Sequence, residues 1–245
     1  MQDRTKGQDL TKAQDRTKGQ APSGHQHDLE WGAGDVPIST RFNDPYFSAE
    51  NGLSETNHVF LAGNDLPARF TDGFHVAELG FGTGLNLLAA LWAWRAAGVA
   101  GTLHFTSFEA FPMQGAAMIR AQAAFPELRE VAHELAPHWQ AGDTTFSGTD
   151  FQFTMITGDA RETLPRWQGR ADAWFLDGFS PAKNPELWEE ALMAEVGKHT
   201  APGGTVATYT AAGFVRRGLS AAGFTVTRPP GHGRKRHMTR GHLPG

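Results

Sequence analysis

The sequence predicts an α/β protein with a mostly parallel, doubly wound sheet and an irregular N-terminal lobe. Short apolar runs alternate with longer helical stretches from position 75 onward, which is typical of parallel strands joined by right-handed crossovers. A glycine-rich turn follows the first run, and polar residues end several later ones. Ligands bind at the carboxyl ends of the strands in such sheets. The polar residues at these ends are therefore the first candidates for a functional site.

Composition limits the class of protein before any motif is considered. A chain of 245 residues with 40% hydrophobic residues can bury one sizeable core, so a single domain is expected. The absence of cysteine excludes disulfides, cysteine-ligated zinc, iron–sulfur clusters and a thiol nucleophile. No apolar run approaches the roughly 18 residues that span a bilayer, and the histidines lack metal-binding spacing. We expect a cytoplasmic protein without metal or membrane, whose net charge of -4 restricts nucleic-acid binding to a local patch.

The chain divides into three segments. Residues 1–28 contain the repeat "QDRTKG", "QDLTKA", "QDRTKG"; it has no apolar periodicity, so a disordered tail without catalytic role is predicted. Residues 29–72, rich in Pro, Asn, Asp and aromatic residues, are expected to form the lobe, with short helices, that contributes to the substrate site. Residues 73–245 are expected to form the sheet-based core.

The core elements follow from the alternation of apolar runs and helical stretches. We expect strands at 75–79, 103–109, 151–158, 171–178, 204–210 and 224–229. Helices are expected at 85–97, 112–124, 160–167, 186–198 and 211–222.

The glycine turn after the first strand, "ELGFGTG", indicates a ligand that approaches the backbone closely. Gly80, Gly82 and Gly84 permit positive φ, and the following helix directs its positive end toward the turn. A dinucleotide site would have its third glycine three residues after the second, whereas here it comes after two. The carboxylate of Glu78, two residues before the first glycine, suits a cationic ligand. A purely structural strand-to-helix turn is the alternative.

Two further strand ends carry carboxylates. Glu109 ends the second strand, where an acidic residue can accept both hydroxyls of a ribose. Asp159 follows the third strand and is either an acceptor for an adenine amino group or an ordinary helix N-cap. Together with the glycine turn, these residues resemble the nucleoside site of S-adenosylmethionine (SAM)-dependent methyltransferases.

The fourth strand leads into "DAWFLDGFSPAKNPELW", which places Asp177 at the strand end. Gly178 allows a sharp turn, and Phe179, Pro181 and Pro185 form a stiff, partly apolar wall. A carboxylate in such surroundings should have a raised pKa and could take a proton. Capping of the loop through backbone N–H groups is an equally good interpretation.

Five segments carry a wider resemblance: "DVPISTRFNDPYFSAENGL", "HVFLAGNDLPARF", "ELGFGTGLN", "DAWFLDGFSPAKNPELW" and "TYTAAGFVRRGL". They resemble the methyltransferase domain of the bifunctional tRNA 5-methylaminomethyl-2-thiouridine biosynthesis protein and its stand-alone relatives, over positions 35–238. The resemblance implies a Rossmann-like methyltransferase fold and methyl transfer from SAM to the aminomethyl nitrogen on C5 of the wobble uridine, position 34 of tRNA. It also implies that Asp177 takes part in catalysis. Asn86 joins the expected cofactor residues, and Phe179 and Lys183 join the expected substrate residues.

Bifunctional members of that family carry a C-terminal FAD-dependent oxidase domain. An oxidase is therefore expected as a separate or missing partner, and the sequence leaves open whether the chain is a stand-alone enzyme or a fragment.

The chemistry implied by the resemblance agrees with the residue types. An alkylamine has a pKa of about 10, so it is mostly protonated at neutral pH and needs a base before it can attack a methyl group. Asp177 can supply that base. Transfer to ring carbon 5 of a pyrimidine usually requires a cysteine, which the chain lacks.

The expected RNA contacts lie in the lobe and near the C-terminus. Tyr46 and Phe47 could stack on an unstacked base and Arg41 could reach phosphate, although packing on the sheet is the alternative for both aromatic residues. The stretch "GHGRKRHMTR" concentrates positive charge that is either a solvated surface or a tRNA patch. Its basic residues are Arg234, Lys235, Arg236 and Arg240.

Three alternative functions remain from the sequence. The chain could methylate another amine, or it could be a catalytically silent tRNA-binding module that keeps the glycine turn as a scaffold. A nicotinamide oxidoreductase is the third, and the glycine spacing disfavours it.

Overall fold

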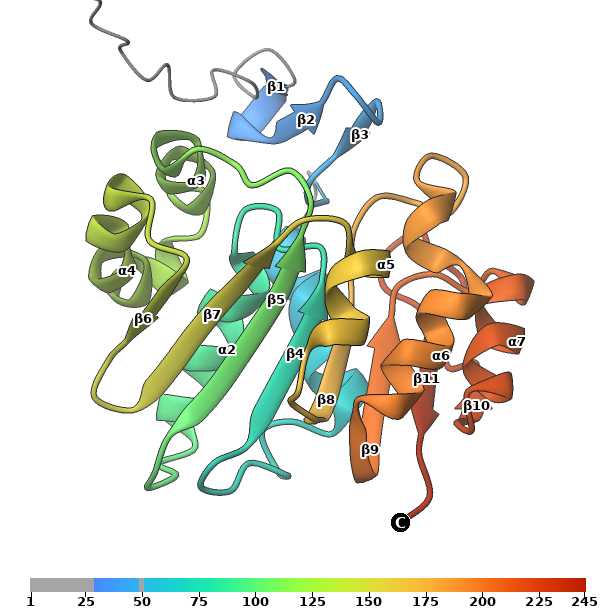
Figure 1. Cartoon of the computed structure of the whole chain (residues 1–245). Coiled ribbons are helices and arrows are strands. Elements are labelled where there is room, and N and C mark those ends of the chain that lie inside the picture. The colour runs from blue at the N-terminus through green and yellow to red at the C-terminus, as the bar shows by residue number, and fades with distance from the viewer. Residues whose placement is uncertain (1–28, 49–50) are drawn as a thin grey trace, which may run out of the picture.

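The computed structural model describes residues 29–48 and 51–245, and an eight-stranded sheet forms its centre (Figure 1). The predicted tail at 1–28 lies outside the described residues. The strand order is β10-β11-β9-β8-β4-β5-β7-β6. The strands are β4 (His75–Leu79), β5 (Leu103–Glu109), β6 (Thr145–Ser147), β7 (Phe151–Thr157), β8 (Ala171–Leu176), β9 (Thr200–Thr208), β10 (Thr225–Thr227) and β11 (Thr239–His242).

The five strands at the centre of the sheet are parallel, and antiparallel pairs lie at both edges. β9, β8, β4, β5 and β7 pair in parallel, whereas β11 pairs antiparallel with β9 and β10, and β6 pairs antiparallel with β7. The chain enters at β4, continues outward through β5 and β7, and returns to β8 on the other side of β4. The strand order therefore reverses between β4 and β8, where open α/β sheets bind ligands.

Helices cover both faces of the sheet, which confirms the predicted doubly wound, mostly parallel fold. β8 shows why: Ala173 and Phe175 pack in one hydrophobic cluster, and Trp174 and Leu176 pack in the other. Because successive strand residues face opposite sides, an apolar strand needs a helical layer on each. α2 and α4 contribute to the first cluster, and α6 and α7 to the second. The helices of the core are α2 (Leu85–Ala96), α3 (Gly115–Gln122), α4 (Arg129–Ala141), α5 (Ala160–Thr163), α6 (Glu190–Lys198) and α7 (Gly213–Ala221).

Prolines explain where several helices depart from their expected ranges. The helix expected at 160–167 is divided into α5 and the 3-10 helix η6 (Leu164–Arg166), which has a proline in its first turn. The helix expected at 186–198 begins only at Glu190, after the 3-10 helix η7 (Pro185–Trp188). Another 3-10 helix, η5 (Pro126–Leu128), leads into α4. The strand β11 and the elements α4 and β6 were not expected.

The N-terminal lobe contains the expected short helices and, in addition, a small antiparallel sheet that the sequence did not indicate. Figure 1 shows this sheet above the carboxyl ends of the central strands. Arg69 joins the end of the lobe to the core by donating hydrogen bonds to the backbone oxygens of Asp172 and Gly203. The lobe elements are β1 (Leu29–Trp31), η2 (Ala33–Asp35), β2 (Pro37–Ser39), β3 (Asp44–Pro45), α1 (Gly52–Thr56), the π-helix η3 (Asn57–Leu61) and η4 (Ala62–Asn64).

Among the residues at 29–48 and 51–245, no helix has the length and apolar character needed to cross a bilayer. Within the same part of the chain, no three His, Asp or Glu side chains are grouped as a metal site would require.

Candidate active site

A cavity of about 980 Å³ lies where β4, β5 and β8 end beneath the N-terminal lobe. It brings together most of the residues predicted from the sequence. From the expected cofactor set it is lined by Gly80, Gly82, Asn86, Glu109, Asp159 and Asp177. From the expected substrate set it is lined by Arg41, Tyr46, Phe47, Phe179, Arg234 and Lys235. The other four predicted residues, Glu78, Gly84, Lys183 and Arg236, do not line it.

The glycine turn brings the ends of β4 and β8 into backbone contact. Gly80 has φ +84°, and a Cβ atom there would lie 2.9 Å from Gly178 Cα and 3.0 Å from the backbone oxygen of Asp177. Gly82 has φ +54°, and a Cβ atom there would lie 3.1 Å from the Tyr46 ring. Only glycine combines this backbone conformation with such close approach. On the side next to Asp177, the cavity is therefore lined by backbone atoms of the turn rather than by side chains.

Glu109, at the end of β5, is fixed by two backbone groups. Its Oε2 accepts the N–H of Gly82 at 3.0 Å, and its Oε1 accepts the N–H of Phe111 at 2.8 Å. A carboxylate has about four lone-pair sites, so each oxygen keeps acceptor capacity. Glu109 thus presents a positioned acceptor beside the glycine turn, and its contact with ribose hydroxyls stays a prediction.

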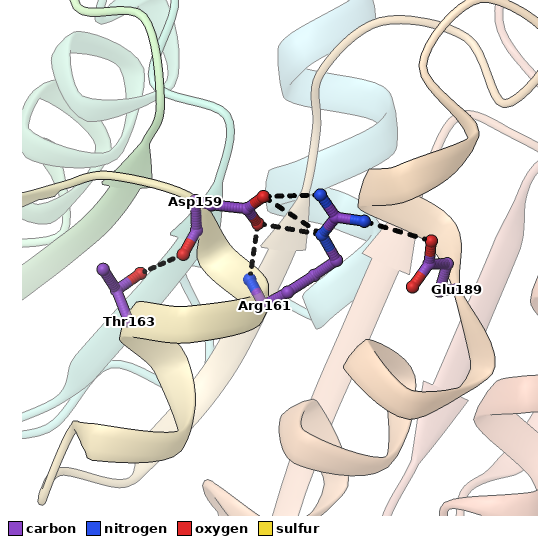
Figure 2. A network of polar contacts seen from close by, with 4 residues as sticks. All are labelled: Asp159, Arg161, Thr163 and Glu189. Carbon is purple, nitrogen blue, oxygen red and sulfur yellow. Dashed lines mark hydrogen bonds and ion pairs between the residues drawn. The ribbon is translucent and has the colours of Figure 1, made fainter.

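Asp159 forms the N-cap of α5, the alternative that the sequence left open. Figure 2 shows its carboxylate accepting from the backbone N–H of Arg161 at 2.9 Å and from the guanidinium group of Arg161 at 2.6 Å. Thr163 donates to the backbone oxygen of Asp159, and Glu189 accepts from the far side of the guanidinium group. The hydrogen bonds from Arg161 hold the pKa of Asp159 below its usual range. A contact between Asp159 and adenine stays a prediction.

Asp177 and Glu78 are joined through one side-chain amide. Asn86 Nδ2 donates to Asp177 Oδ2 and to Glu78 Oε1, each at 2.8 Å. The other oxygen of Asp177 accepts the N–H of Gly178 at 2.8 Å, and the other oxygen of Glu78 accepts the Ser107 hydroxyl at 2.6 Å. Glu78 is fully buried beneath the cavity floor. Its position explains why it does not line the cavity itself.

Burial sets the protonation of both carboxyl groups. Shielding from water raises the pKa of Asp177 to about 6, against the opposing effect of its two donors. The same cause raises the pKa of Glu78 well above its usual range. Asp177 is therefore mostly ionised at neutral pH and more basic than an ordinary aspartate, while burial favours the protonated form of Glu78.

The cavity is also lined by two residues that were not predicted from the sequence, Tyr209 and Glu55. The Tyr209 hydroxyl donates to the backbone oxygen of Gly178 at 2.8 Å. Lys235 Nζ lies 4.0 Å from the centre of the Tyr209 ring and 2.5 Å from Glu55 Oε1. Tyr209 directly follows β9, so the strand-end rule could have identified it. Glu55 sits in α1 and had no comparable signal.

The predicted substrate residues divide between the cavity wall and the framework around it. Tyr46 and Phe179 meet edge to face with ring centres 5.0 Å apart, and Arg41 lies 4.4 Å from the Phe111 ring centre. Phe47 packs on Phe125 and the core, in agreement with the packing alternative.

Two of the predicted substrate residues lie outside the cavity. Lys183 binds Asp44 Oδ1 at 2.9 Å and the backbone oxygen of Asn43, so it joins the loop after β8 to the lobe. Arg236 is exposed beside the cavity residues Arg234 and Lys235. Substrate roles for all of these residues stay predictions.

The cavity fits the nucleoside of SAM in three respects. The turn of Gly80 and Gly82 is too close-packed for a Cβ atom. Glu109 is a fixed acceptor at the end of β5. Asp177 would place a negative charge beside the positively charged sulfonium group of SAM. All three lie at the point where the strand order reverses.

Comparison with known proteins identifies the relatives of this chain. A family model described as S-adenosyl-L-methionine-dependent methyltransferase matches residues 126–244. The chain is 46% identical over 235 residues to the tRNA 5-methylaminomethyl-2-thiouridine biosynthesis bifunctional protein MnmC of Stutzerimonas stutzeri, covering 91% of this chain and 36% of that protein. The protein of the same name from Methylobacillus flagellatus is 45% identical over 234 residues, with coverage of 91% and 36%. The chain thus spans about a third of the length of these relatives.

A solved structure confirms the fold. The crystal structure of MNMC2 from Aquifex aeolicus superposes with a TM-score of 0.74 at 24% identity, over 91% of this chain and 74% of that one. The predicted Rossmann-like methyltransferase fold and the predicted cofactor class are therefore confirmed. The chain is therefore similar to S-adenosylmethionine-dependent methyltransferases over residues 126–244, and it aligns with about a third of the bifunctional tRNA 5-methylaminomethyl-2-thiouridine biosynthesis proteins.

Proposed function

We propose that this chain transfers a methyl group from SAM to the aminomethyl nitrogen on C5 of the wobble uridine, position 34 of tRNA, in the cytoplasm. One observation carries the proposal: Asp177, with a pKa raised to about 6, opens into a large cavity directly beside the glycine turn. The printed names of the relatives point to the same modified nucleoside.

Gly80, Gly82 and Glu109 are the residues proposed to hold SAM, which when bound supplies an electrophilic methyl group on a sulfonium ion. Asp177 contributes a negative charge close to that site.

Asp177 prepares the acceptor amine. An alkylammonium ion has a pKa of about 10, so it must lose a proton before its nitrogen lone pair can form a bond. The ionised carboxyl group accepts a hydrogen bond from the amine, orients it and takes its proton. The new nitrogen–carbon bond then forms as the carbon–sulfur bond breaks. A carboxyl group with a pKa of about 6 suits this role better than an ordinary aspartate, because it is ionised at neutral pH and binds the proton more strongly.

The cavity wall formed by the lobe and the loop after β8 has the residue types that recognise an unstacked base. Tyr46 and Phe179 offer aromatic surfaces at the cavity, while Arg41, Arg234 and Lys235 supply positive charge at its rim. Single-stranded RNA is typically bound by such a combination of aromatic rings and cations.

The decisive experiment is methyl transfer from labelled SAM to tRNA isolated from cells lacking this modification step, with nucleoside analysis of the product. We expect 5-methylaminomethyl(-2-thio)uridine to form. Small amines and a lysine-rich protein, tested in parallel, distinguish an enzyme for another amine. Binding of tRNA without binding of SAM would show a non-catalytic module. This result, or methylation of the other amines but not of tRNA, would refute the proposal.

A further inference from the structure

We propose that Asn86 is the positioning residue for Asp177: its side-chain amide, oriented by Thr56, holds the carboxyl group in place and anchors it to the buried Glu78. The consequence for catalysis rests on the proposed function, whereas the contact itself is a property of the free protein.

The amide of Asn86 is held in one orientation. Its Oδ1 accepts the Thr56 hydroxyl at 3.0 Å, while its Nδ2 donates to Glu78 and Asp177. A flipped amide would turn its oxygen toward two carboxyl groups and lose both of those hydrogen bonds. Asn86 and Thr56 are each only 4% exposed, so water has little access to replace the lost donor. The Thr56 hydroxyl therefore selects the orientation in which Asn86 donates to both acids.

The two carboxyl groups that share this amide have different roles. They cannot both ionise at such short range without a large cost. Glu78 is fully buried, which raises its pKa well above the usual range, whereas Asp177 reaches the cavity. The hydrogen bond from Asn86 to Asp177 therefore orients the carboxyl group that a substrate can reach, and Glu78 holds the same amide from inside the fold.

Asn86 also links Asp177 to the glycine turn. It lies in the first turn of α2, two residues after Gly84, so it is joined directly to the glycine turn. Gly178 holds Oδ1 of Asp177 and Asn86 holds Oδ2, and these two donors together fix the plane of the carboxyl group. The remaining lone pairs of Asp177 are the ones available to a substrate amine.

The test is a titration of the Asp177 carboxyl group in the free protein, followed by NMR with carbon-13-labelled aspartate and assigned with Asp177→Asn. Wild type is expected to titrate near pH 6. Asn86→Leu removes the donor and should raise the midpoint by about one pH unit, a tenfold change in proton affinity. Thr56→Val, which keeps the shape of the side chain and removes its hydroxyl, should raise the midpoint by a smaller amount. Ser54→Ala removes a hydroxyl from the same helix, where it contacts His232 rather than Asn86, and should leave the midpoint unchanged.

The charged and titratable groups that face Asp177 remain in all these variants: Glu78 of β4, Glu55 of α1, Lys235 of the 231–236 segment, and Tyr209 after β9. A midpoint unchanged in both Thr56→Val and a folded Asn86→Leu would overturn the proposal. If Asn86→Leu does not fold, an unchanged Thr56→Val midpoint has the same meaning. In methyl transfer, both variants should lower kcat and leave the KM for tRNA unchanged. Because the titration needs neither SAM nor tRNA, failure of the proposed function would leave its outcome intact.

Discussion

At the scale of single residues, Asp177 carries the proposed chemistry, and its removal should affect rate rather than folding. Asp177→Asn keeps nearly the same shape but loses the charge, so turnover should fall by roughly 10² to 10⁴. Raising the pH should partly rescue the variant, because free amine then forms without a protein base. Wild-type activity should fall as the pH drops through about 6, where Asp177 becomes protonated.

Single-turnover methyl transfer from pH 6 to 10, measured beside a melting curve, checks this. A stable Asp177→Asn variant with full activity at neutral pH would rule out the base. A variant that loses thermal stability and keeps the wild-type pH profile would indicate a structural cap instead.

Glu109 should contribute to SAM affinity through its charge. Glu109→Gln keeps an oxygen acceptor but weakens each hydrogen bond from ribose, and charge-assisted bonds contribute about 1.5 to 3 kcal/mol each. Calorimetric titration with SAM should show weaker binding, with the exposed Glu127→Gln as a control for the loss of one charge. Equal affinities for Glu109→Gln and wild type would show that Glu109 only holds the backbone N–H groups of Gly82 and Phe111 and does not bind SAM.

The site was predictable wherever a residue ends a strand, because a parallel sheet gathers those ends at one edge. Gly80, Glu109 and Asp177 were all found in this way and line one cavity. The hydrogen bond between Thr56 and Asn86 was not predictable, since it depends on how α1 packs against α2. Asp159 could not be assigned from the sequence for a different reason: an aspartate between a strand and a helix fits a ligand acceptor and an N-cap equally well.

At the scale of elements, His75 at the start of β4 should make stability depend on pH. Burial and the neighbouring His104 lower the pKa of His75 to about 4, against the effect of Asp172. The unfolded chain takes up this proton near pH 6.5, but the folded chain does so only near pH 4. The stabilising contribution is therefore complete above pH 6.5 and is lost as the pH falls toward 4, by up to about 3 kcal/mol.

Urea unfolding of wild type and His75→Phe between pH 4 and 7.5 tests this contribution. The phenyl ring retains the edge-to-face contact with Trp167 but cannot titrate, so the dependence on pH should flatten. His242→Phe, at an exposed position of β11, is the control that should leave the slope unchanged. An unchanged slope in His75→Phe would show that other groups control acid stability.

Elements were predictable where one periodicity dominated. β8, "ADAWFL", is a nearly continuous apolar run, because helices bury both of its faces. α4 was missed because Pro137 lies within it, and proline normally disfavours a helix interior. β11, "TRGH", has no apolar alternation and is defined only by its antiparallel pairing with β9 and β10. Its position depends on tertiary pairing that no local pattern encodes.

At the scale of the whole molecule, the site forms because β8 lies beside β4 in the sheet. The order of the strands in the sheet cannot be predicted from the order of the elements along the sequence. The 231–236 segment, which connects β10 to β11, also reaches the cavity rim, where Arg234 and Lys235 line it. The positive charge of this segment is therefore local, in a protein whose net charge is -4.

Charge reversal at this rim should weaken tRNA binding without affecting SAM. We choose Arg234→Glu with Arg236→Glu and leave Lys235 unchanged, so that its ion pair with Glu55 in the cavity is kept. Each lost phosphate contact should lower the slope of log affinity against log salt by about one. The matched control is Arg166→Glu with Arg170→Glu. These residues precede β8, at the amino end of this strand, whereas the cavity lies at its carboxyl end. Equal tRNA affinity of the rim variant and this control across a salt series would remove the rim from the tRNA interface.

The most direct measurement compares two tRNAs that differ only at the acceptor nitrogen. One carries 5-aminomethyl(-2-thio)uridine at position 34, and the other carries the same nucleoside with its amine acetylated. After incubation with the chain and isotopically labelled SAM, nuclease digestion and mass spectrometry locate the label. The account predicts label only on the position-34 nucleoside of the free-amine tRNA and none in the acetylated one. Equal labelling of both tRNAs, label at another nucleoside, or no label in either would contradict it.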